Sequence, residues 1–334
     1  MTSRPETIYL VATPGGHLDL LLALRPAFEE YQRVWVVSPG ASADALHADG
    51  EEVRVLPRFH GLTAGNLRLA MRSLGPAVRE RPRMVVTAGS GSVVPFCAAT
   101  RALGARVVFV ETMARVHNPS ESGRVLSRLA SSVLVQWPEM LEVYPQARVG
   151  RPALLDQLTV ARAPRSTGDG TFVAVGTHID PFDRLLRVVD QAVGAGVLPG
   201  PAVAQTGVCS YRPRHMEAVA WMRPAEMDAA AERARRVVTH AGSGMIARAL
   251  GAGLTPLVVP RKASEGEHVD DHQVQITEKL GQIGLVVPVD GDIRPEHLAA
   301  ADAERPPMTR AFGDAPALAD LVRREIERLS GAHA

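Results

Sequence analysis

The chain has few of the residues that mark several common protein classes. Its 334 residues include only two cysteines, Cys97 and Cys209, whose wide separation fits neither a metal site nor a redox pair. We expect both to be buried thiols in a reducing compartment. The formal net charge is only +1, so no overall field favours a nucleic-acid partner.

Long hydrophobic runs are also missing. No apolar stretch approaches the roughly 18 residues that a membrane-spanning helix needs. Residues 1–13 lead directly into a strand-like segment and lack the pattern of a secretory signal. We therefore expect a cytoplasmic protein, and any membrane association must be peripheral.

Short β-branched runs alternate with amphipathic stretches, a rhythm typical of β-α-β units on a parallel sheet. In the first half the predicted strands are Ile8–Thr13, Val34–Ser38, Val53–Pro57, Met84–Ala88, Val107–Glu111 and Val133–Trp137. In the second half they are Phe172–Val175, Val203–Thr206, Ala218–Met222, Val237–His240, Leu257–Pro260 and Leu285–Val289. The segment Gly150–Gly170, rich in Arg, Pro and Ala without a clear period, indicates a linker.

These patterns predict an α/β protein of two doubly wound, Rossmann-like lobes that face a central cleft. We place the first lobe at residues 1–150, the linker at 151–170 and the second lobe at 171–334. Asp314–Arg328 would be the closing helix of the second lobe.

Glycine-rich turns follow four of the predicted strands. They are Thr13–His17, Ala88–Ser92, Val175–His178 and Thr239–Gly244. Ligands in open α/β sheets bind beyond the carboxyl ends of the strands, and glycine lets the backbone approach them closely. The helix that follows offers amide groups and a positive dipole end, so a diphosphate is the expected ligand. None of the turns fits G-x-x-x-x-G-K-[ST], and the first is not G-x-G-x-x-G, which disfavours a P-loop NTPase and a standard dinucleotide fold.

Several motifs of the second half resemble a known enzyme family. The motifs VVTHAGSG (Val237–Gly244), PLVVPR (Pro256–Arg261) and EHVDDHQ (Glu267–Gln273) resemble the donor half of glycosyltransferase family 28. They are most similar to the catalytic subunit of the two-subunit transferase that adds the second GlcNAc to dolichol-linked sugar. Phe172–Leu186 resembles the opening motif of that subunit and of its bacterial exopolysaccharide counterparts.

Motifs of the first half resemble the membrane-recruiting partner subunit of the same transferase. These motifs are Pro14–His17, Thr87–Phe96, Val108–Arg124 and Val135–Pro145. The chain thus resembles a natural fusion of the two subunits in one GT-B fold.

The resemblance implies an inverting transferase that moves a hexose-type sugar (GlcNAc, glucose or glucuronic acid) from UDP to a lipid-linked or exopolysaccharide acceptor. It implies no cofactor and no essential metal, and it implies action at the inner face of the cell membrane on a polyprenyl-diphosphate-linked or glycan acceptor. Donor contacts are then expected from Gly176, Thr177, Gln205, His240, Gly242, Ser243, Gly244, Asp271, His272 and Gln273. Acceptor contacts are expected from Gly15, Gly16, Ser90 and Arg115. A UDP-sugar 2-epimerase-like isomerase, or a non-catalytic sugar-nucleotide-binding subunit, is the alternative.

Two side chains compete for the role of catalytic base. His17 has an imidazole that titrates near neutrality, and a helix N-terminus helps to keep it unprotonated. Glu111, at the end of a buried-looking strand, is the rival base, or it orients the acceptor, or it pairs with Arg115.

The EHVDDHQ motif allows more than one use. Asp271 and Gln273 match an acid–amide pair that reads sugar hydroxyls, while a helix cap and a metal site on Asp270, Asp271 and His272 are the alternatives. Asp290-Gly291-Asp292 formally matches a D-x-D metal motif, but an Asp-Gly pair after a strand favours a simple turn. A ribose-binding carboxylate found in some family members is replaced here by Arg248.

Asn66–Arg83 predicts a basic amphipathic helix that could rest on an anionic membrane. Its apolar stripe would be Leu67, Met71, Leu74 and Val78, with Arg68, Arg72, Arg79 and Arg81 close by. An ordinary helix of the lobe with a solvated face is the alternative. Further positive charge that could meet a lipid diphosphate comes from Arg115, His117, Arg124 and Arg128.

Overall fold

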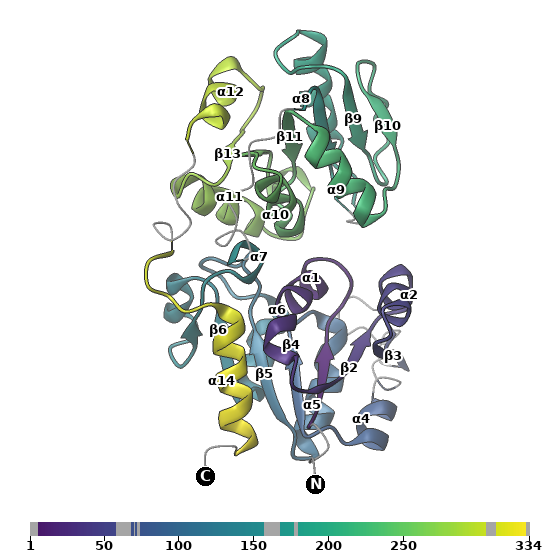
Figure 1. Cartoon of the computed structure of the whole chain (residues 1–334), viewed down its shortest axis with the longest axis vertical. Helices are drawn as coiled ribbons and strands as arrows, with labels where there is room; N and C mark the ends of the chain where they lie inside the picture. Colours follow the sequence, from purple (N-terminus) through teal and green to yellow (C-terminus); the bar gives the residue numbers. More distant parts are fainter. Residues whose placement is uncertain are drawn as a thin grey trace. The chain divides into compact units, whose positions relative to one another are not determined.

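The computed structural model describes residues 6–57, 68–69, 71, 74–156, 168–176, 180–304 and 312–331. The chain divides into two compact units. The first comprises Met1–Asp156 together with Asp314–Ala334, and the second comprises Gln157–Gly313. Each unit is a parallel β-sheet with helices on both faces (Figure 1).

The first unit contains a sheet of seven strands in the order β3-β2-β1-β4-β5-β6-β7, and all neighbouring strands are parallel. The strands are β1 (Thr7–Val11), β2 (Gln32–Val37), β3 (Glu52–Val55), β4 (Met84–Thr87), β5 (Arg106–Val110), β6 (Ser132–Val135) and β7 (Arg148–Val149). The central strands are buried on both faces, which is why their sequences are apolar runs rather than alternating patterns.

Helices cover both faces of this sheet. One core joins the sheet to α1 (Gly16–Ala23), η1 (Arg25–Phe28), α2 (Ala41–Ala48), α7 (Ala153–Asp156) and α14 (Leu318–Ser330). Outside that core, α4 (Leu74–Glu80), α5 (Val94–Ala102) and α6 (Glu121–Leu129) pack in series, with α5 and α6 also on β5. Two short 3₁₀ turns, η2 (Gly91–Val93) and η3 (Pro138–Glu142), complete the unit. This two-sided cover follows from right-handed crossovers that run outward in both directions from β1 and β4.

The second unit contains a parallel sheet in the order β10-β9-β8-β11-β12-β13. Its strands are β8 (Thr171–Ala174), β9 (Ala202–Gln205), β10 (Glu217–Val219), β11 (Arg236–Thr239), β12 (Leu257–Val258) and β13 (Val287–Pro288). One hydrophobic cluster holds α8 (Asp183–Gly194) and α12 (Pro295–Asp302), and another holds α9 (Pro224–Arg233) and α10 (Ser243–Gly251). The 3₁₀ turn η5 (Ala263–Glu265) precedes α11 (His272–Gln282), which packs beside β13.

The closing helix α14 packs in the first unit, whereas the sequence analysis assigned it to the second lobe. Its buried residues Leu318, Leu321, Val322 and Ile326 belong to the first unit's core. Glu325 is only 1% exposed, and its carboxylate forms ion pairs with Arg148 of β7 at 2.5 Å and with Arg328 at 2.8 Å. An amphipathic pattern predicts that a helix buries one face, but it does not say which sheet receives that face.

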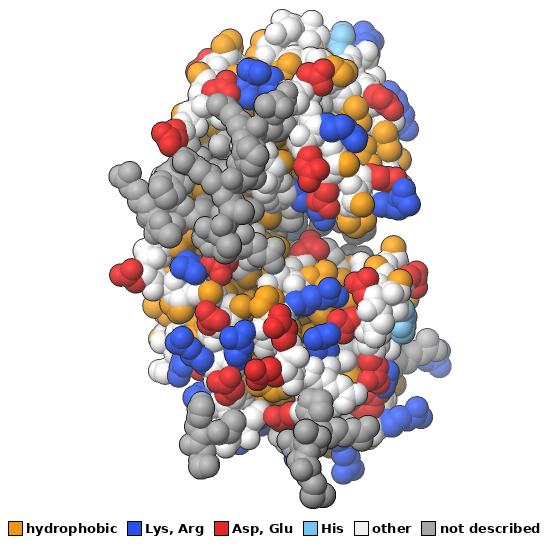
Figure 2. Space-filling model, viewed as in Figure 1, with side chains coloured by type: hydrophobic (Ala, Val, Ile, Leu, Met, Phe, Trp, Pro, Cys, Tyr) orange, Lys and Arg blue, Asp and Glu red, His pale blue; other side chains and the backbone are white. Residues whose placement is uncertain are grey.

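The predicted membrane-facing stretch Asn66–Arg83 is only partly within the described residues. Leu67 and Arg72 lie outside them, while Met71 and Val78 are more than half exposed. No helix in the described ranges combines the length and apolar character needed to cross a membrane. On the face shown in Figure 2, acidic and basic side chains are interspersed on each unit, in keeping with the small net charge.

Candidate functional site

All four predicted glycine turns lie where the strand order of a sheet reverses. In the first sheet the reversal falls between β1 and β4, and in the second it falls between β8 and β11. The turns directly follow these four strands. A reversal of strand order opens a crevice at the carboxyl edge of the sheet, and ligands of doubly wound folds bind there. Each unit therefore has one candidate site.

Side-chain hydrogen bonds close both reversal points, and the threonine bond is equivalent in the two units. Thr87 ends β4 and donates from Oγ1 to the last carbonyl of β1 at 2.8 Å, and Thr239 ends β11 and donates to the last carbonyl of β8 at 2.9 Å. A histidine adds a second bond in each unit. The Nδ1 atom of His17 lies 2.9 Å from the carbonyl oxygen of Ala88, and that of His240 lies 3.3 Å from the carbonyl oxygen of Ala174.

The geometry of His17 suits the predicted base. It is the second residue of α1, after Gly15, whose φ of +96° favours glycine. A carbonyl oxygen only accepts, so Nδ1 is the protonated nitrogen and Nε2 is the basic nitrogen of the neutral ring. The side chain is half-buried, and Gly16 beside it is exposed.

Glu111, the rival base, is enclosed by its own loop. The residue is 1% exposed, and its carboxylate accepts from Tyr144 Oη at 3.0 Å, from the Thr112 amide at 3.2 Å and from Ser120. Burial raises the pKa of Glu111, and the hydrogen bonds from Tyr144, Thr112 and Ser120 together with the charge of Arg115 lower it. A Cβ on Gly123 would lie 2.4 Å from Oε2, so this carboxylate is packed directly against the start of α6. These contacts hold the loop between β5 and α6.

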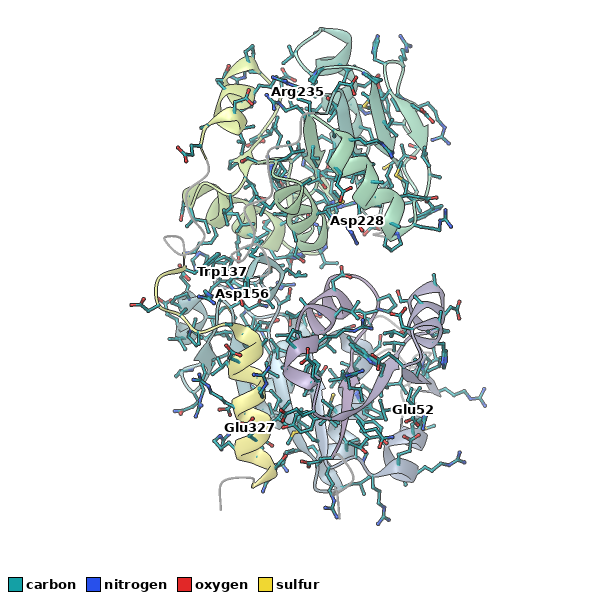
Figure 3. All side chains as sticks on the ribbon, in the orientation of Figure 1. Glu52, Trp137, Asp156, Asp228, Arg235 and Glu327 are labelled. Carbon is teal, nitrogen blue, oxygen red and sulfur yellow. The ribbon has the colours of Figure 1, made fainter. Side chains whose placement is uncertain are left out.

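That loop carries Arg115, one of the predicted acceptor contacts. Besides Glu111 it is held by Trp137 (labelled in Figure 3), whose Nε1 donates to the Met113 carbonyl at 2.6 Å. Arg115 itself is half-buried. Ser90, another predicted acceptor residue, has a φ of +92° and donates its amide to Ser122 Oγ at 3.2 Å. A non-glycine residue in this conformation is strained, and such strain is concentrated at functional sites.

In the second unit, the imidazole of His240 fills the space between two glycine turns. A Cβ on Gly176 would lie 2.5 Å from Nε2 of His240, and a Cβ on Gly242 would lie 2.2 Å from the same atom. Any side chain at either glycine would therefore displace the ring. Gly176 also has a φ of +84°. Thr177, predicted to act beside Gly176, lies outside the described residues.

The turn after β11 presents a helix start. Gly242 is the N-cap of α10, which begins with Ser243 and Gly244 and has no side-chain cap. The first amides of a helix have no partner within the helix, so this end can receive an anion.

Two amide side chains predicted to contact the donor also bond to the backbone. Gln205 is 2% exposed; its Oε1 accepts from the Gly176 amide at 3.1 Å, and its Nε2 donates to the carbonyls of Gly176 and Ala220 at 3.2 Å each. Gln273 accepts on Oε1 from the amides of Ala241 at 3.3 Å and Arg261 at 3.1 Å. Both hold the glycine turns in place.

The other members of the EHVDDHQ motif lie just before α11. Asp271 accepts from the Ala263 amide at 2.8 Å, and His272 pairs through Nδ1 with Asp270. Within the described residues, His268, Asp270 and His272 form the one group whose ligand atoms could hold a metal ion. The Asp290-Gly291-Asp292 triplet is a turn, in which Gly291 has a φ of +84° and Asp290 pairs with Lys262 at 2.7 Å. Arg248 forms an ion pair with Asp228, labelled in Figure 3.

Sequence reasoning missed Arg261, the buried organiser of the second unit's site. It is 1% exposed, and its Nη1 donates to the carbonyls of Asp180 at 3.0 Å, Pro181 at 3.2 Å and Glu267 at 3.2 Å. Its Nη2 donates to the carbonyl of Val175 at 3.3 Å. Arginine directly after the apolar strand of PLVVPR was the available signal, because a cation there must be buried and paired.

Comparisons with known proteins match each unit to a family model. The family described as Oligosaccharide biosynthesis protein Alg14 like matches residues 64–151, and the Glycosyltransferase family 28 C-terminal domain matches residues 200–301. Over 172 residues the chain is 27% identical to the mouse UDP-N-acetylglucosamine transferase subunit ALG14, covering 42% of this chain and 79% of that one.

A second relative spans both units. It is the UDP-N-acetylglucosamine--N-acetylmuramyl-(pentapeptide) pyrophosphoryl-undecaprenol N-acetylglucosamine transferase of Xanthomonas campestris, 28% identical over 320 residues and covering 87% of this chain and 72% of the relative. The crystal structure of MurG from Acinetobacter baumannii superposes with a TM-score of 0.60 at 17% identity, over 96% of this chain and all of that one.

Two Rossmann-like units with glycine turns at their reversal points, and solved structures of the same architecture, give this chain the GT-B fold. The predicted fold class is thereby confirmed. The matches over residues 64–151 and 200–301, together with the relative that spans both units, support a UDP-sugar glycosyltransferase that carries a family 28 C-terminal domain.

Proposed function

We propose that the protein transfers GlcNAc from UDP to a hydroxyl of a lipid-linked acceptor with inversion at the anomeric carbon. The observation that carries this proposal is the β8–β11 reversal point. There the turns at Gly176 and Gly242, the ring of His240 and the start of α10 converge within the unit that carries the family 28 donor domain. UDP-N-acetylglucosamine is the donor named for both the mouse and the Xanthomonas relatives.

The donor lobe would hold the leaving diphosphate. The amides of Gly242, Ser243 and Gly244 at the start of α10 would receive its negative charge, which grows as the sugar departs. His240 would lie beside the phosphates, because its ring fills the gap between the two glycine turns. Transfer would need no metal, since helix amides take over the role of neutralising the leaving group. Asp271 and Gln273 would read the sugar hydroxyls from the start of α11, with Gln205 and Arg261 positioning the turns.

The first lobe would supply the base. The acceptor oxygen attacks C1 of the sugar, the bond from C1 to the UDP oxygen breaks, and the acceptor proton passes to Nε2 of His17. Gly15, Gly16 and Ser90 would line the acceptor side, and Arg115 would add positive charge toward a lipid diphosphate. A polyprenyl-diphosphate acceptor would require the enzyme to work at the inner face of the cell membrane, bound peripherally.

The test is a UDP-release assay with UDP-GlcNAc, UDP-glucose and UDP-glucuronic acid, each with a polyprenyl-diphosphate-sugar acceptor and membranes. Release should require both UDP-GlcNAc and acceptor. His17→Ala should lower kcat by about 10²- to 10⁴-fold while UDP binding is retained, and the exposed control His47→Ala should be unchanged. Nucleotide-dependent stabilisation without transfer from any donor would instead support a binding subunit. Conversion of UDP-GlcNAc to its C2 epimer without acceptor would support an isomerase.

A further inference from the structure

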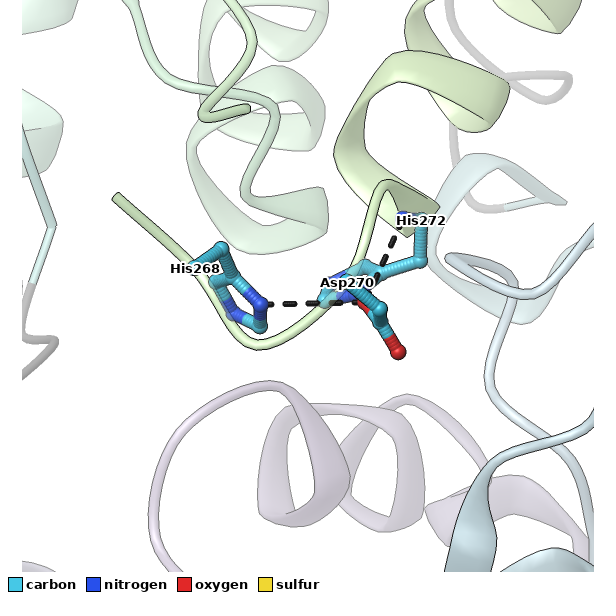
Figure 4. Close-up of side chains that lie close together, drawn as sticks. All are labelled: His268, Asp270 and His272. Atoms are coloured by element: carbon cyan, nitrogen blue, oxygen red, sulfur yellow. Dashed lines mark hydrogen bonds and ion pairs between the residues drawn. The ribbon is translucent and has the colours of Figure 1, made fainter. Parts of the chain in front are cut away.

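Three potential metal ligands meet in the loop that leads into α11. His268 and Asp270 lie in this loop, and His272 is the first residue of the helix (Figure 4). One ligand atom from each lies within 4.8 Å of the others. His272 Nδ1 is 2.5 Å from Asp270 Oδ1, and His268 Nδ1 is 3.7 Å from the same oxygen. The two rings stand edge to face with centroids 4.4 Å apart.

The group holds more imidazole than one ion pair needs. The Val269 amide donates to Nδ1 of His268 at 3.0 Å, so a cation bound through this nitrogen would take over its single lone pair from the amide. A single His–Asp ion pair needs one imidazole, whereas here two imidazoles approach one carboxylate oxygen.

The group is buried on its imidazole side and open to solvent on its carboxylate side. The side chains of His268 and His272 are 10% and 15% exposed, while that of Asp270 is 39% exposed. The imidazoles are therefore largely shielded from water, and an ion can enter from the carboxylate side. Loss of water on the imidazole side strengthens the attraction between a bound cation and the carboxylate.

The surrounding contacts fix both ends of this loop. Glu267, just before His268, accepts from Arg184 at 2.7 and 2.9 Å and from the Lys262 amide at 3.1 Å. On the other side, Asp271 accepts from the Ala263 amide at 2.8 Å. A ligand set held at both ends loses little conformational entropy when an ion binds.

We propose that His268, Asp270 and His272 bind one divalent transition-metal ion of the Zn²⁺ class. Two imidazoles and a carboxylate select such ions over Mg²⁺ and Ca²⁺, which prefer oxygen ligands throughout. Three protein ligands leave a coordination position for an oxygen ligand such as water. Metal binding at this site does not depend on the proposed sugar transfer, since the reaction proposed above passes through no metal.

The test measures binding to the full chain after treatment with a chelator, with neither donor nor acceptor present. Titration with Zn²⁺ against a chromophoric competitor should give one site per chain, and Co²⁺ should produce the visible absorption of a low-coordinate nitrogen–oxygen site. His268→Ala, Asp270→Asn and His272→Gln should each weaken Zn²⁺ binding by at least about tenfold. The matched controls His47→Ala and Asp292→Asn, at exposed positions elsewhere, should bind as the wild type does.

The proposal is overturned if the wild-type chain binds no Zn²⁺, or if a triple variant of the three ligands binds it as tightly as the wild type. Circular dichroism shows whether each variant is folded. Should one ligand variant unfold, the other two and the Co²⁺ spectrum still decide the question. If the variants lose Zn²⁺ binding but still transfer sugar, the proposed function stands. If the wild type binds Zn²⁺ but transfers no sugar, the metal-site proposal stands and the proposed function fails.

Discussion

Replacement of Arg261 by methionine should destabilise the second unit and weaken donor binding together. Methionine has nearly the length of arginine and is apolar, so it fills the buried space without a charge. It cannot donate, and the hydrogen bonds of Arg261 to the carbonyls of Val175, Asp180, Pro181 and Glu267 are lost. Its packing over the Phe182 ring, 4.6 Å from guanidinium to centroid, would be kept only in part.

The size of the effect follows from opposing terms. A hydrogen bond to a charged group contributes about 1.5–3 kcal/mol, and a buried carbonyl left without a donor costs about 1–3 kcal/mol. Against this, burying the guanidinium is itself costly, as the lowered pKa of Arg261 indicates, and methionine removes that cost. We expect a net loss of about 3 kcal/mol in the free energy of unfolding of this unit.

Donor binding should fall further than stability alone requires. Val175 directly follows β8 and Asp180 lies shortly before α8, so the guanidinium holds the backbone at two points between this strand and this helix. Denaturant unfolding and UDP calorimetry measure the two effects. Arg223→Met is the matched control, because Arg223 is 82% exposed in its side chain and pairs only at the surface, where little loss of stability is expected. If Arg261→Met and Arg223→Met unfold at the same denaturant concentration, the guanidinium does not organise the unit and the reasoning fails.

Three further substitutions test separate parts of the structure. Gly242→Ala should lower UDP affinity at least about tenfold in calorimetry, since its Cβ would displace the ring of His240, with a fold unchanged by circular dichroism. Leu318→Ala should destabilise the first unit by about 2–5 kcal/mol and not the second, measured by denaturant unfolding. Glu111→Gln should remove a pH dependence: the raised pKa means that the wild type loses stability as pH rises above the ordinary carboxyl pKa through the raised one, and unfolding at a series of pH values should show that slope only in the wild type.

The strands and their turns could be predicted because a buried parallel strand must be apolar and must end where a ligand or helix begins. The six long strands of the first sheet were expected, and only the two-residue β7 was missed, since two residues carry no period. What could not be predicted depends on contacts between distant segments. The amide of Gln205 could have faced a ligand, and only the positions of Gly176 and Ala220 show that the backbone occupies it. His268 was overlooked because the spacing His-x-Asp-x-His does not place the three side chains on one face of a helix or strand. Only the folded loop before α11 brings them together.

The two reversal points are built from nearly the same sequence, VVTAGSG at Val85–Gly91 and VVTHAGSG at Val237–Gly244, yet their chemistry differs for local reasons. After β11 the glycine turn leads directly into α10, whose first residues all carry amide groups. After β4 the same letters lead into η2 and then α5, which has a proline, without an N–H, in its first turn. The first unit places the imidazole of His17 within the first turn of α1, whereas the imidazole of His240 in the second unit lies between Gly176 and Gly242. A diphosphate needs amides and an attacking hydroxyl needs a base, so the second unit suits the donor and the first suits the acceptor.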